Sequence, residues 1–408
     1  MKAPRLASLG ILAALTTAAC SPDVSLETRS TSSVTGTGGS SGTGGSGGAG
    51  AGGALPTGCP ETLPAPQDCG AFADHCGNAT PLAAGGELTF ATGALVTSGH
   101  VWFVAEPSWL GPCGGFFYRV PKGGGAAERG IPADRITNAE AEGDTIYLVA
   151  STDDPETTSI RAIVGDDQQS IGDIHHVLTP SGYPRILLTP TPGGVVTYDA
   201  SGPTGATFFR VSLGGLEPIP ADMPVGYLGS APAYDGQAVF VSLIGWNNDT
   251  LWDRKLARVS ASPPLALASE AGTRLDESIV ADVDTLFFAT GDPGSPGGLM
   301  GISRVAKAGG AATPILPPAY LWISQILIDD AEVFYAGWAF AEGAAGIWAV
   351  PKAGGAVRRV WAAVVGPTSR VRMDAQNLYF SVDGRENSGE ITGPGGFIVR
   401  VAKSTSLP

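Results

Sequence analysis

A strand-like segment recurs seven times between residues 100 and 382, and successive copies are 43 to 50 residues apart. Each copy is a short apolar run such as "TIYLVA" at 145–150 or "TLFFAT" at 285–290. An aromatic residue occupies the third position in all copies except one. These positions are Trp102, Tyr147, Thr197, Phe240, Phe287, Phe334 and Tyr379. A repeat of this length indicates one supersecondary unit that packs on its neighbours rather than a series of independent domains.

A glycine-rich hairpin shows how each unit is built. It is written three times with a Lys–x–Gly–Gly core, at 117–130, 302–315 and 347–360. Glycine supplies the positive φ angles of a tight turn, and we expect the lysine of that turn to be solvated. Before most aromatic segments lies another short strand, such as "QILIDDA" at 325–331. Four antiparallel strands in each repeat are typical of a propeller blade.

The predicted fold class is therefore all-β, a seven-bladed β-propeller of four-stranded antiparallel blades over 87–408. The 59 glycines and 32 prolines favour many short strands joined by turns. The chain ends before the seventh blade has a fourth strand, and a ring must close or leave an unpaired edge. We expect the strand "ELTFA" at 87–91 to complete that last blade.

Several of these pieces resemble known repeat proteins. They are "DTIYLVAS", "VDTLFFATGD", "DAQNLYFSVDG", "RVPKGGG" and "AVPKAGG". From Ala94 to Pro408 the pattern is similar to the YWTD-like seven-bladed propellers, and more so to a group of repeat lipoproteins of myxobacteria and their relatives. The resemblance implies a fold and an envelope location. It implies no activity, because no blade carries the full Tyr-Trp-Thr-Asp run.

The N-terminus predicts export and lipid attachment. "MKAPRLASLGILAALTTAAC" has a basic start, a short apolar run and small residues before Cys20, so we interpret 1–19 as a signal peptide. The segment resembles a bacterial lipobox with Thr17 where leucine is preferred, which implies acylation of Cys20. Ser21 follows Cys20 at the position where the inner-membrane retention signal of such lipoproteins has Asp, and this resemblance implies an outer-membrane location. Residues 20–54 are rich in Gly and Ser and predict a disordered tether, and 55–86 form a cysteine-containing lead-in.

Four cysteines remain after Cys20, namely Cys59, Cys69, Cys76 and Cys113. In an exported chain an even number predicts two disulfides, and three connectivities are open. We expect Cys113 to attach the 59–76 segment to the first part of the domain. The alternative is a zinc site formed by Cys59, Cys69, His75 and Cys76, although the spacing matches no common zinc pattern.

The charge and motif content exclude several function classes. A formal charge of −14 argues against nucleic acid, which needs a basic surface. No Walker, Rossmann or G-x-S-x-G motif is present. Aspartates precede several aromatic segments, and we interpret them as turn formers rather than metal ligands, so no metal or cofactor is predicted. They are Asp144, Asp235, Asp284, Asp330 and Asp374.

Aromatic residues in predicted loops are the best candidates for binding. The loops that join second to third and fourth to first strands lie on one face of a propeller. We expect a monomer that binds a protein, peptide or carbohydrate there, because exposed rings with polar neighbours suit both kinds of contact. The candidates are Trp109, Trp246, Asn247, Trp252, Tyr320, Trp322 and Trp338.

Two other functions stay open. One is a lyase or hydrolase with a loop-built site in the central channel, using His175, His176 and nearby acids such as Asp173. The other is a structural role in an envelope assembly. Histidines and carboxylates that converge near the axis would favour the enzyme.

Overall fold

The computed structural model describes residues 60–63, 65–70, 73–84, 88–90, 93–107, 115–133, 135–154, 156–175, 186, 188–199, 207–221, 227–229, 232–247, 251–260, 265–269, 279–292, 299–364, 366–367, 370–382 and 396–407. The chain has two units, Met1–Gly53 and Ala54–Pro408. The predicted signal peptide, Cys20 and most of the tether lie outside the described residues. Within the described part, no helix has the length and hydropathy required of a membrane span.

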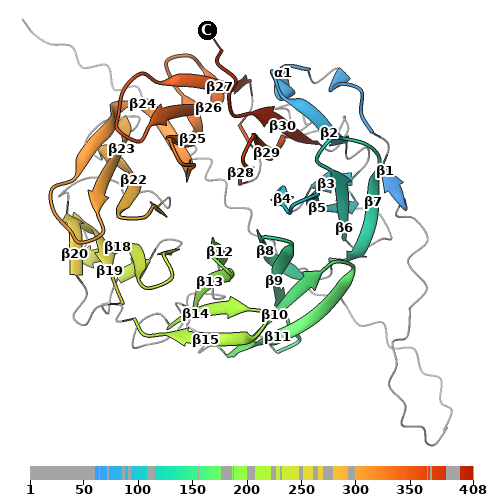
Figure 1. Cartoon of the computed structure of the whole chain (residues 1–408), viewed down its shortest axis with the longest axis horizontal. Coiled ribbons are helices and arrows are strands. Elements are labelled where there is room, and N and C mark those ends of the chain that lie inside the picture. Colours follow the sequence, from blue (N-terminus) through green and yellow to red (C-terminus); the bar gives the residue numbers. More distant parts are fainter. Residues whose placement is uncertain are drawn as a thin grey trace, which may run out of the picture. The chain divides into compact units, whose positions relative to one another are not determined.

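The fold of the second unit is built from antiparallel sheets that follow the repeat (Figure 1). The first sheet contains β1 (Thr62–Leu63), β3 (Leu88–Phe90), β4 (Leu95–Val96), β5 (His100–Pro107), β6 (Phe116–Pro121) and β7 (Ala127–Pro132). The second contains β8 (Ile136–Glu142), β9 (Thr145–Ser151), β10 (Thr157–Val164) and β11 (Asp167–His175). The third contains β12 (Leu188–Thr191), β13 (Gly194–Asp199), β14 (Thr207–Ser212) and β15 (Gly215–Ile219).

The remaining sheets follow the same plan. The fourth contains β16 (Tyr227–Gly229), β17 (Ala233–Tyr234), β18 (Val239–Asn247), β19 (Leu251–Arg258) and β20 (Leu265–Ser269). A seven-stranded sheet contains β21 (Ile279–Ala281), β22 (Thr285–Asp292), β23 (Leu299–Ala306), β24 (Thr313–Ile328), β25 (Glu332–Ala339), β26 (Ala344–Pro351) and β27 (Arg358–Ala363). The last sheet contains β28 (Arg372–Met373), β29 (Asn377–Val382), β30 (Phe397–Ala402) and β2 (Thr80–Ala84).

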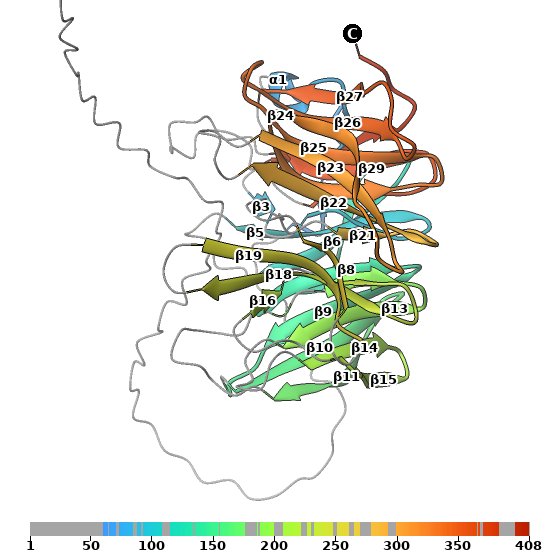
Figure 2. The same ribbon diagram turned by 90° about the vertical axis from the view of Figure 1, so that its left-hand side faces the viewer.

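Sheets that are consecutive in the chain pack against each other, and the last returns to the first. β4 contacts β8, β12 contacts β8 and β17, β17 contacts β21, β27 contacts β30, and β28 contacts β4. Figure 2 shows the same sheets edge-on. Hydrophobic clusters fill the spaces between them; for example, Tyr118 of the first sheet and Tyr379 of the last lie fully buried in one cluster. The aromatic residues of the repeat are therefore core residues, as predicted.

The strand that completes the last sheet differs from the prediction. β2 pairs with β30, from Thr80 opposite Arg400 to Ala84 opposite Phe397. The expected segment forms β3 instead and pairs with β5, with Leu88 opposite Pro107. Proline is tolerated on an edge strand and at a bulge, and Pro81 lies on the outer strand of this sheet at a register shift. An N-terminal strand does add to the last sheet, but the sequence segment was wrong.

The lysines of the three glycine-rich turns, and Lys403 after β30 in the last repeat, are ion-paired, contrary to the expectation that the turn lysines are solvated. Each reaches an aspartate in the preceding group of four strands, and the ammonium group lies 5.5 to 6.0 Å from the centre of an aromatic ring of the repeat. The pairs are Lys122–Asp374, Lys307–Asp235, Lys352–Asp282 and Lys403–Asp329, at 2.6 to 2.9 Å. The lysine side chain extends from one sheet to the next, so its recurrence in the repeat produces the same contact between neighbouring sheets.

Candidate functional site

Aromatic side chains gather at one end of the β24–β25 hairpin. The rings of Tyr320 and Phe340 are 5.0 Å apart and tilted by 59°. Next to them, Trp322 and Trp338 are directly opposite each other in the strand pairing. This end joins the fourth strand of one group to the first of the next, and the second strand to the third. We call Tyr320, Trp322, Trp338 and Phe340 the aromatic cluster.

The members of this cluster differ in exposure. Tyr320 is 46% exposed and Phe340 is 40% exposed, while Trp322 and Trp338 are half-buried. Trp322 packs on the hydrophobic cluster around Ile323, and Trp338 packs on the cluster around Trp361. Each tryptophan is therefore supported by a different hydrophobic cluster, and each exposed ring is two residues from a tryptophan in the chain. Leaving rings of this size in water forgoes about 1.5 kcal/mol or more of burial energy each.

The other aromatic candidates do not join this cluster in the described structure. Trp109 lies outside the described residues. Trp246, Asn247 and Trp252 were predicted in a loop, but they belong to strands β18 and β19, where Trp246 is opposite Trp252. The hairpin extends further than the repeat suggested, since β18 runs to Asn247 and β19 begins at Leu251. The side chains of these three residues lie outside the described part.

An ion pair crosses between the inner strands of sheets that are not neighbours. Arg372 of β28 donates from Nε to Glu140 Oε1 of β8 at 2.7 Å, and its other nitrogen donates to Glu140 Oε2. Glu140 is 1% exposed. Arg370 donates to the carbonyl oxygen of Leu188 in β12. The inner strands of the second, third and last sheets are thus joined directly by arginines.

His175 lies far from these inner strands. It ends β11, which is the outer strand of the order β11-β10-β9-β8. Its Nδ1 is 3.0 Å from Thr157 Oγ1, and that hydroxyl lies 2.8 Å from Asp154 Oδ2. Hydrogen bonds from the Glu156 backbone and from Thr157 lower the pKa of Asp154. The prediction of His175 in the central channel was wrong, because β11 is the fourth strand of its sheet. His176 lies outside the described residues.

Two of the five predicted aspartates, Asp235 and Asp374, form the expected turns, whereas Asp144 accepts a hydrogen bond from the Ser98 backbone in the first sheet. Asp374 Oδ1 accepts hydrogen bonds from the backbone N–H groups of Gln376 and Asn377 at 2.9 and 2.8 Å, and Asp235 does the same for the residues that follow it. In two repeats the residue differs from the one predicted, since Asp282 and Asp329 take this role rather than Asp284 and Asp330. In Asp235, Asp282, Asp329 and Asp374 the other carboxylate oxygen binds a lysine.

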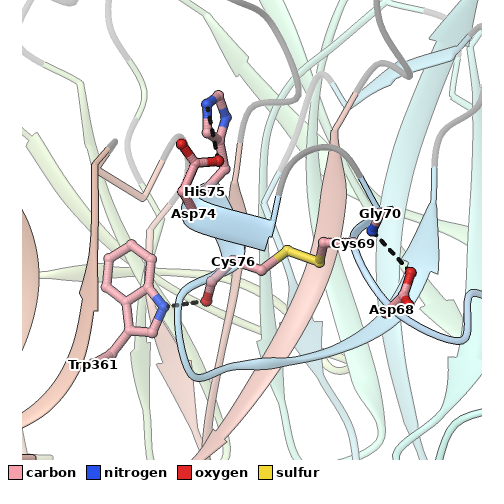
Figure 3. Close-up of a disulfide and its surroundings, with 7 residues drawn as sticks. All are labelled: Asp68, Cys69, Gly70, Asp74, His75, Cys76 and Trp361. Carbon is pink, nitrogen blue, oxygen red and sulfur yellow. Dashed lines mark hydrogen bonds and ion pairs between the residues drawn. A yellow bond between two sulfur atoms is a disulfide. The ribbon is translucent and has the colours of Figure 1, made fainter.

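The cysteine segment is held by a disulfide (Figure 3). Cys69 and Cys76 are bonded, with their Cα atoms 6.4 Å apart, on either side of the start of helix α1 (Ala73–Cys76). The carbonyl oxygen of Cys76 accepts a hydrogen bond from Trp361 Nε1 at 2.7 Å. The bond uses two thiolates of the zinc alternative, so that alternative is wrong. Among the described residues, no three His, Cys, Asp or Glu side chains come together as a metal site.

Comparisons of structure identify the architecture. No protein-family model matches the sequence, and a search of curated proteins finds no relative. An oligogalacturonate lyase from Vibrio parahaemolyticus superposes with a TM-score of 0.57 at 9% identity, over 86% of this chain and 98% of that one. The β-propeller domain of the Trilobed protease from Pyrococcus furiosus gives a TM-score of 0.56 at 9% identity, over 78% and 97%. The chain is a β-propeller.

Other propeller structures are similar at the same level. An oligogalacturonate lyase in complex with manganese has a TM-score of 0.56 at 12% identity, over 87% of this chain and 98% of that one. A prolyl endopeptidase has a TM-score of 0.51 at 13% identity, and this chain spans 47% of its length. At such identities the likeness defines the fold of the propeller and nothing of its chemistry.

The sequence missed two polar features of this propeller. One is the Glu140–Arg372 pair, whose partners are separated by more than half of the chain. The other is an open groove on β10 and β11, lined by polar side chains. The only signal for the second was the run of polar residues from Asp166 to Ser170, which a loop explains equally well.

Proposed function

We propose that the protein is a tethered envelope lipoprotein whose seven-bladed propeller binds a protein or peptide through the aromatic cluster. The single observation that carries the binding proposal is the exposed pair Tyr320 and Phe340 beside the half-buried Trp322 and Trp338. Aromatic anchors that are rigidly supported from below are typical of interface hot spots. Pro317, Pro318 and Ala319 are also exposed next to Tyr320, which extends the apolar surface.

The strand pairing supports seven blades. Each of the first four sheets and the last sheet contains a four-strand unit, with extra short strands in the first and fourth. The seven-stranded sheet divides at β24, whose first part pairs with β23 and whose second part pairs with β25. This long strand serves as the outer strand of one unit and the inner strand of the next, which gives two units in that sheet.

Charge favours a basic or neutral partner. The chain carries a formal charge of −14, so its long-range field attracts cations and repels polyanions. A basic peptide would be steered toward the domain, and its apolar side chains would cover the exposed rings. A carbohydrate could stack on the same rings. The binding test below therefore compares peptides with glycans.

Peptide and glycan arrays probed with residues 55–408 test the binding proposal. We expect basic, apolar peptides to be retained, and retention to fall in the double variant Tyr320→Ala/Phe340→Ala. Val283→Ala is the matched control, since Val283 is 81% exposed in the turn between β21 and β22. Retention of glycans alone would replace the peptide proposal with a lectin. Equal retention by the double variant and the unchanged protein would show that the aromatic cluster is not part of the binding surface.

Lipid attachment has its own test. Metabolic labelling with a radioactive fatty acid should label the full chain, and Cys20→Ser should abolish the label and release the protein from membranes. A single fatty acyl chain holds a protein only marginally, and two or more hold it stably. A labelled Cys20→Ser variant, or an unlabelled full chain in the membrane fraction, would contradict the proposed anchor.

A lyase or hydrolase stays the second candidate because Asp154, Thr157 and His175 form a hydrogen-bonded series at an exposed edge. The Thr157 hydroxyl lies between the two ionisable groups and donates to Asp154 Oδ2, and such a hydrogen-bonded series can relay a proton. Turnover of a substrate that His175→Gln abolishes, without change in the melting temperature, would favour this candidate over simple binding.

A further inference from the structure

An open groove of about 500 Å³ runs across the outer strands of the second sheet. Strand β10 contributes Ser159 and Arg161, and β11 contributes Gln168, Gln169, Ser170 and Asp173. Ser159 is directly opposite Asp173, and Arg161 is opposite Ser170 across a bulge. The bulge places an extra residue on the edge strand, which re-aims neighbouring side chains. The volume lies within the range of small-molecule sites.

Most of the polar groups of this groove are not used by the protein. Thr152 completes the lining, and its hydroxyl is hydrogen-bonded to the backbone of Asp154 and Thr157. The other six side chains make no hydrogen bond or ion pair to another described residue, although Arg161 and Asp173 line the same groove. Several arginines elsewhere in the described structure are engaged, as in the Arg358–Glu332 pair of β27 and β25 and the Arg119–Asp166 pair. Ser159 is also 93% buried as a residue, since its exposed fraction is 7%. Gln168, Gln169, Ser170 and Asp173 are exposed, so a ligand would replace water on their donors and acceptors.

We propose that this groove binds a neutral saccharide. Hydroxyl groups donate and accept, and the groove offers the matching set: a guanidinium that donates, a carboxylate that accepts, and two amides and two hydroxyls that do both. Arg161 and Asp173 contribute opposite charges that cancel, so the lining favours a ligand without net charge. Asp173 can accept two hydroxyls of one sugar, and Arg161 can donate to a ring oxygen and a hydroxyl in a fork.

The affinity that such a lining can supply is modest. The groove lacks apolar side chains, so binding depends on hydrogen bonds that replace those made to water, and each is worth little net. A dissociation constant of about 1 mM follows for a mono- or disaccharide. The site is independent of the aromatic cluster, which lies on β24 and β25 in another sheet.

Saturation-transfer NMR with residues 55–408 tests this proposal. The probes are maltose, cellobiose and N,N′-diacetylchitobiose at about 20 mM, well above the expected ~1 mM dissociation constant. Digalacturonate and glycylglycine serve as anionic and zwitterionic comparisons. At least one neutral probe should receive saturation, and it should bind about tenfold more weakly to Arg161→Met, the loss expected for one charged hydrogen bond. Gln168→Ala/Gln169→Ala should weaken it as well.

Arg258→Met is the matched control, since Arg258 is a half-buried arginine on β19 opposite Phe240 and away from the groove. It should leave the affinity within twofold, as should Tyr320→Ala/Phe340→Ala. Each variant is accepted only if its melting temperature is unchanged, and Gln168→Ala/Gln169→Ala covers the case in which Arg161→Met fails to fold. No saturation of any neutral probe, preference for digalacturonate or glycylglycine, or equal binding by the Arg161 and Gln variants would overturn the proposal.

Discussion

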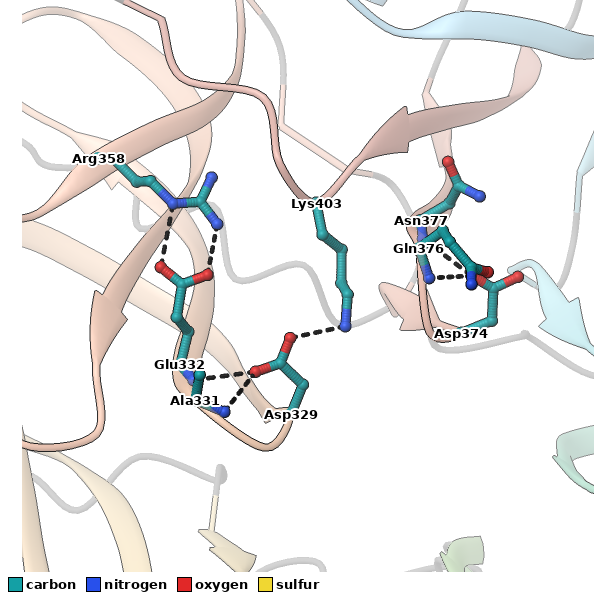
Figure 4. A network of polar contacts seen from close by, with 8 residues as sticks. All are labelled: Asp329, Ala331, Glu332, Arg358, Asp374, Gln376, Asn377 and Lys403. Carbon is teal, nitrogen blue, oxygen red and sulfur yellow. Dashed lines mark hydrogen bonds and ion pairs between the residues drawn. The ribbon is translucent and has the colours of Figure 1, made fainter.

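The ammonium group of Lys403 lies 2.6 Å from the carboxylate of Asp329, which belongs to the preceding group of four strands (Figure 4). The same carboxylate accepts hydrogen bonds from the backbone N–H groups of Ala331 and Glu332 through its other oxygen. Burial alone would raise the pKa of Asp329, but these bonds outweigh it and lower the pKa. One aspartate therefore forms a turn within its own sheet and holds the next sheet through the lysine.

Removing this lysine should loosen the contact between two sheets. The side chains of Lys403 and Asp329 are 11% and 25% exposed, so the pair should contribute more than an exposed ion pair. We expect Lys403→Met to lower the free energy of unfolding by about 1–2 kcal/mol. Urea unfolding measures the change. A double-mutant cycle with Asp329→Asn isolates the pair, and a coupling energy near zero would show that the two residues act separately.

Stability should fall in acid through the same aspartates. Burial raises the pKa of Asp374, but hydrogen bonds from Lys122, the Gln376 and Asn377 backbone and Tyr379 lower it to about 2. A depressed pKa means that the ionised form stabilises the fold, so its contribution is present above pH ~4 and is lost as the pH falls toward 2. For Asp374 we expect a loss of about 2 kcal/mol.

Chemical unfolding between pH 5 and pH 2 checks this dependence. The variant Asp374→Asn should be less stable at pH 5 and should lose less stability on acidification. An unchanged slope in the variant would contradict the assignment of the acid loss to this group.

Glu140 and Arg372 should respond differently to single and double substitution. Glu140 is 1% exposed, and removal of Arg372 would leave its charge buried without a partner. We expect Arg372→Met to destabilise the domain by about 3–5 kcal/mol, and Glu140→Leu/Arg372→Met to recover most of that loss, because two apolar groups need no ionic partner. Thermal melts of the unchanged protein, the single variant and the double variant measure these differences in stability. A double variant as unstable as the single one would show that the pair has no apolar substitute.

The disulfide should hold the segment that completes the last sheet. Cys69 and Cys76 are separated by seven positions, and closing so short a loop stabilises the fold by about 2–3 kcal/mol in the chain-entropy model. Cys69→Ser/Cys76→Ser should lower the free energy of unfolding by that amount. With these two bonded, the two-disulfide prediction leaves Cys59 to pair with Cys113, and peptide mapping without reductant should find that link. A free thiol at both positions would contradict it.

The sequence was sufficient for the architecture because the repeat is local. The aromatic third position and the Lys–x–Gly–Gly hairpin depend on residues close in the chain and appear where expected, whereas the turn aspartate was identified correctly only at Asp235 and Asp374. The closing strand was misplaced because two short apolar segments compete, and Pro81 disfavours a strand except at an edge. Pairing between Lys403 and Asp329 was missed because it depends on how one unit packs on the next.

The candidate sites were harder to predict for a related reason. Tyr320 and Trp322 were found from their position in a connection between strands, but their exposure depends on packing and differs between them. The polar groove combines Arg161 with Asp173. Both line one surface because Ser159, two residues before Arg161 on the same face of β10, is opposite Asp173 in β11, and the sequence does not give this register. His175 was a candidate for a site in the central channel because it lies in a short histidine cluster beside Asp173, whereas its strand is the outer one of its sheet.

The most direct test of the proposed function is the dissociation constant of the strongest array peptide, measured by fluorescence titration for the unchanged protein and for Tyr320→Ala/Phe340→Ala. The two rings are 46% and 40% exposed, so their removal costs the fold little and should act on binding. We predict that the double variant binds at least about tenfold more weakly, while Val283→Ala is unchanged. Equal dissociation constants for all three proteins would contradict a binding surface at the aromatic cluster.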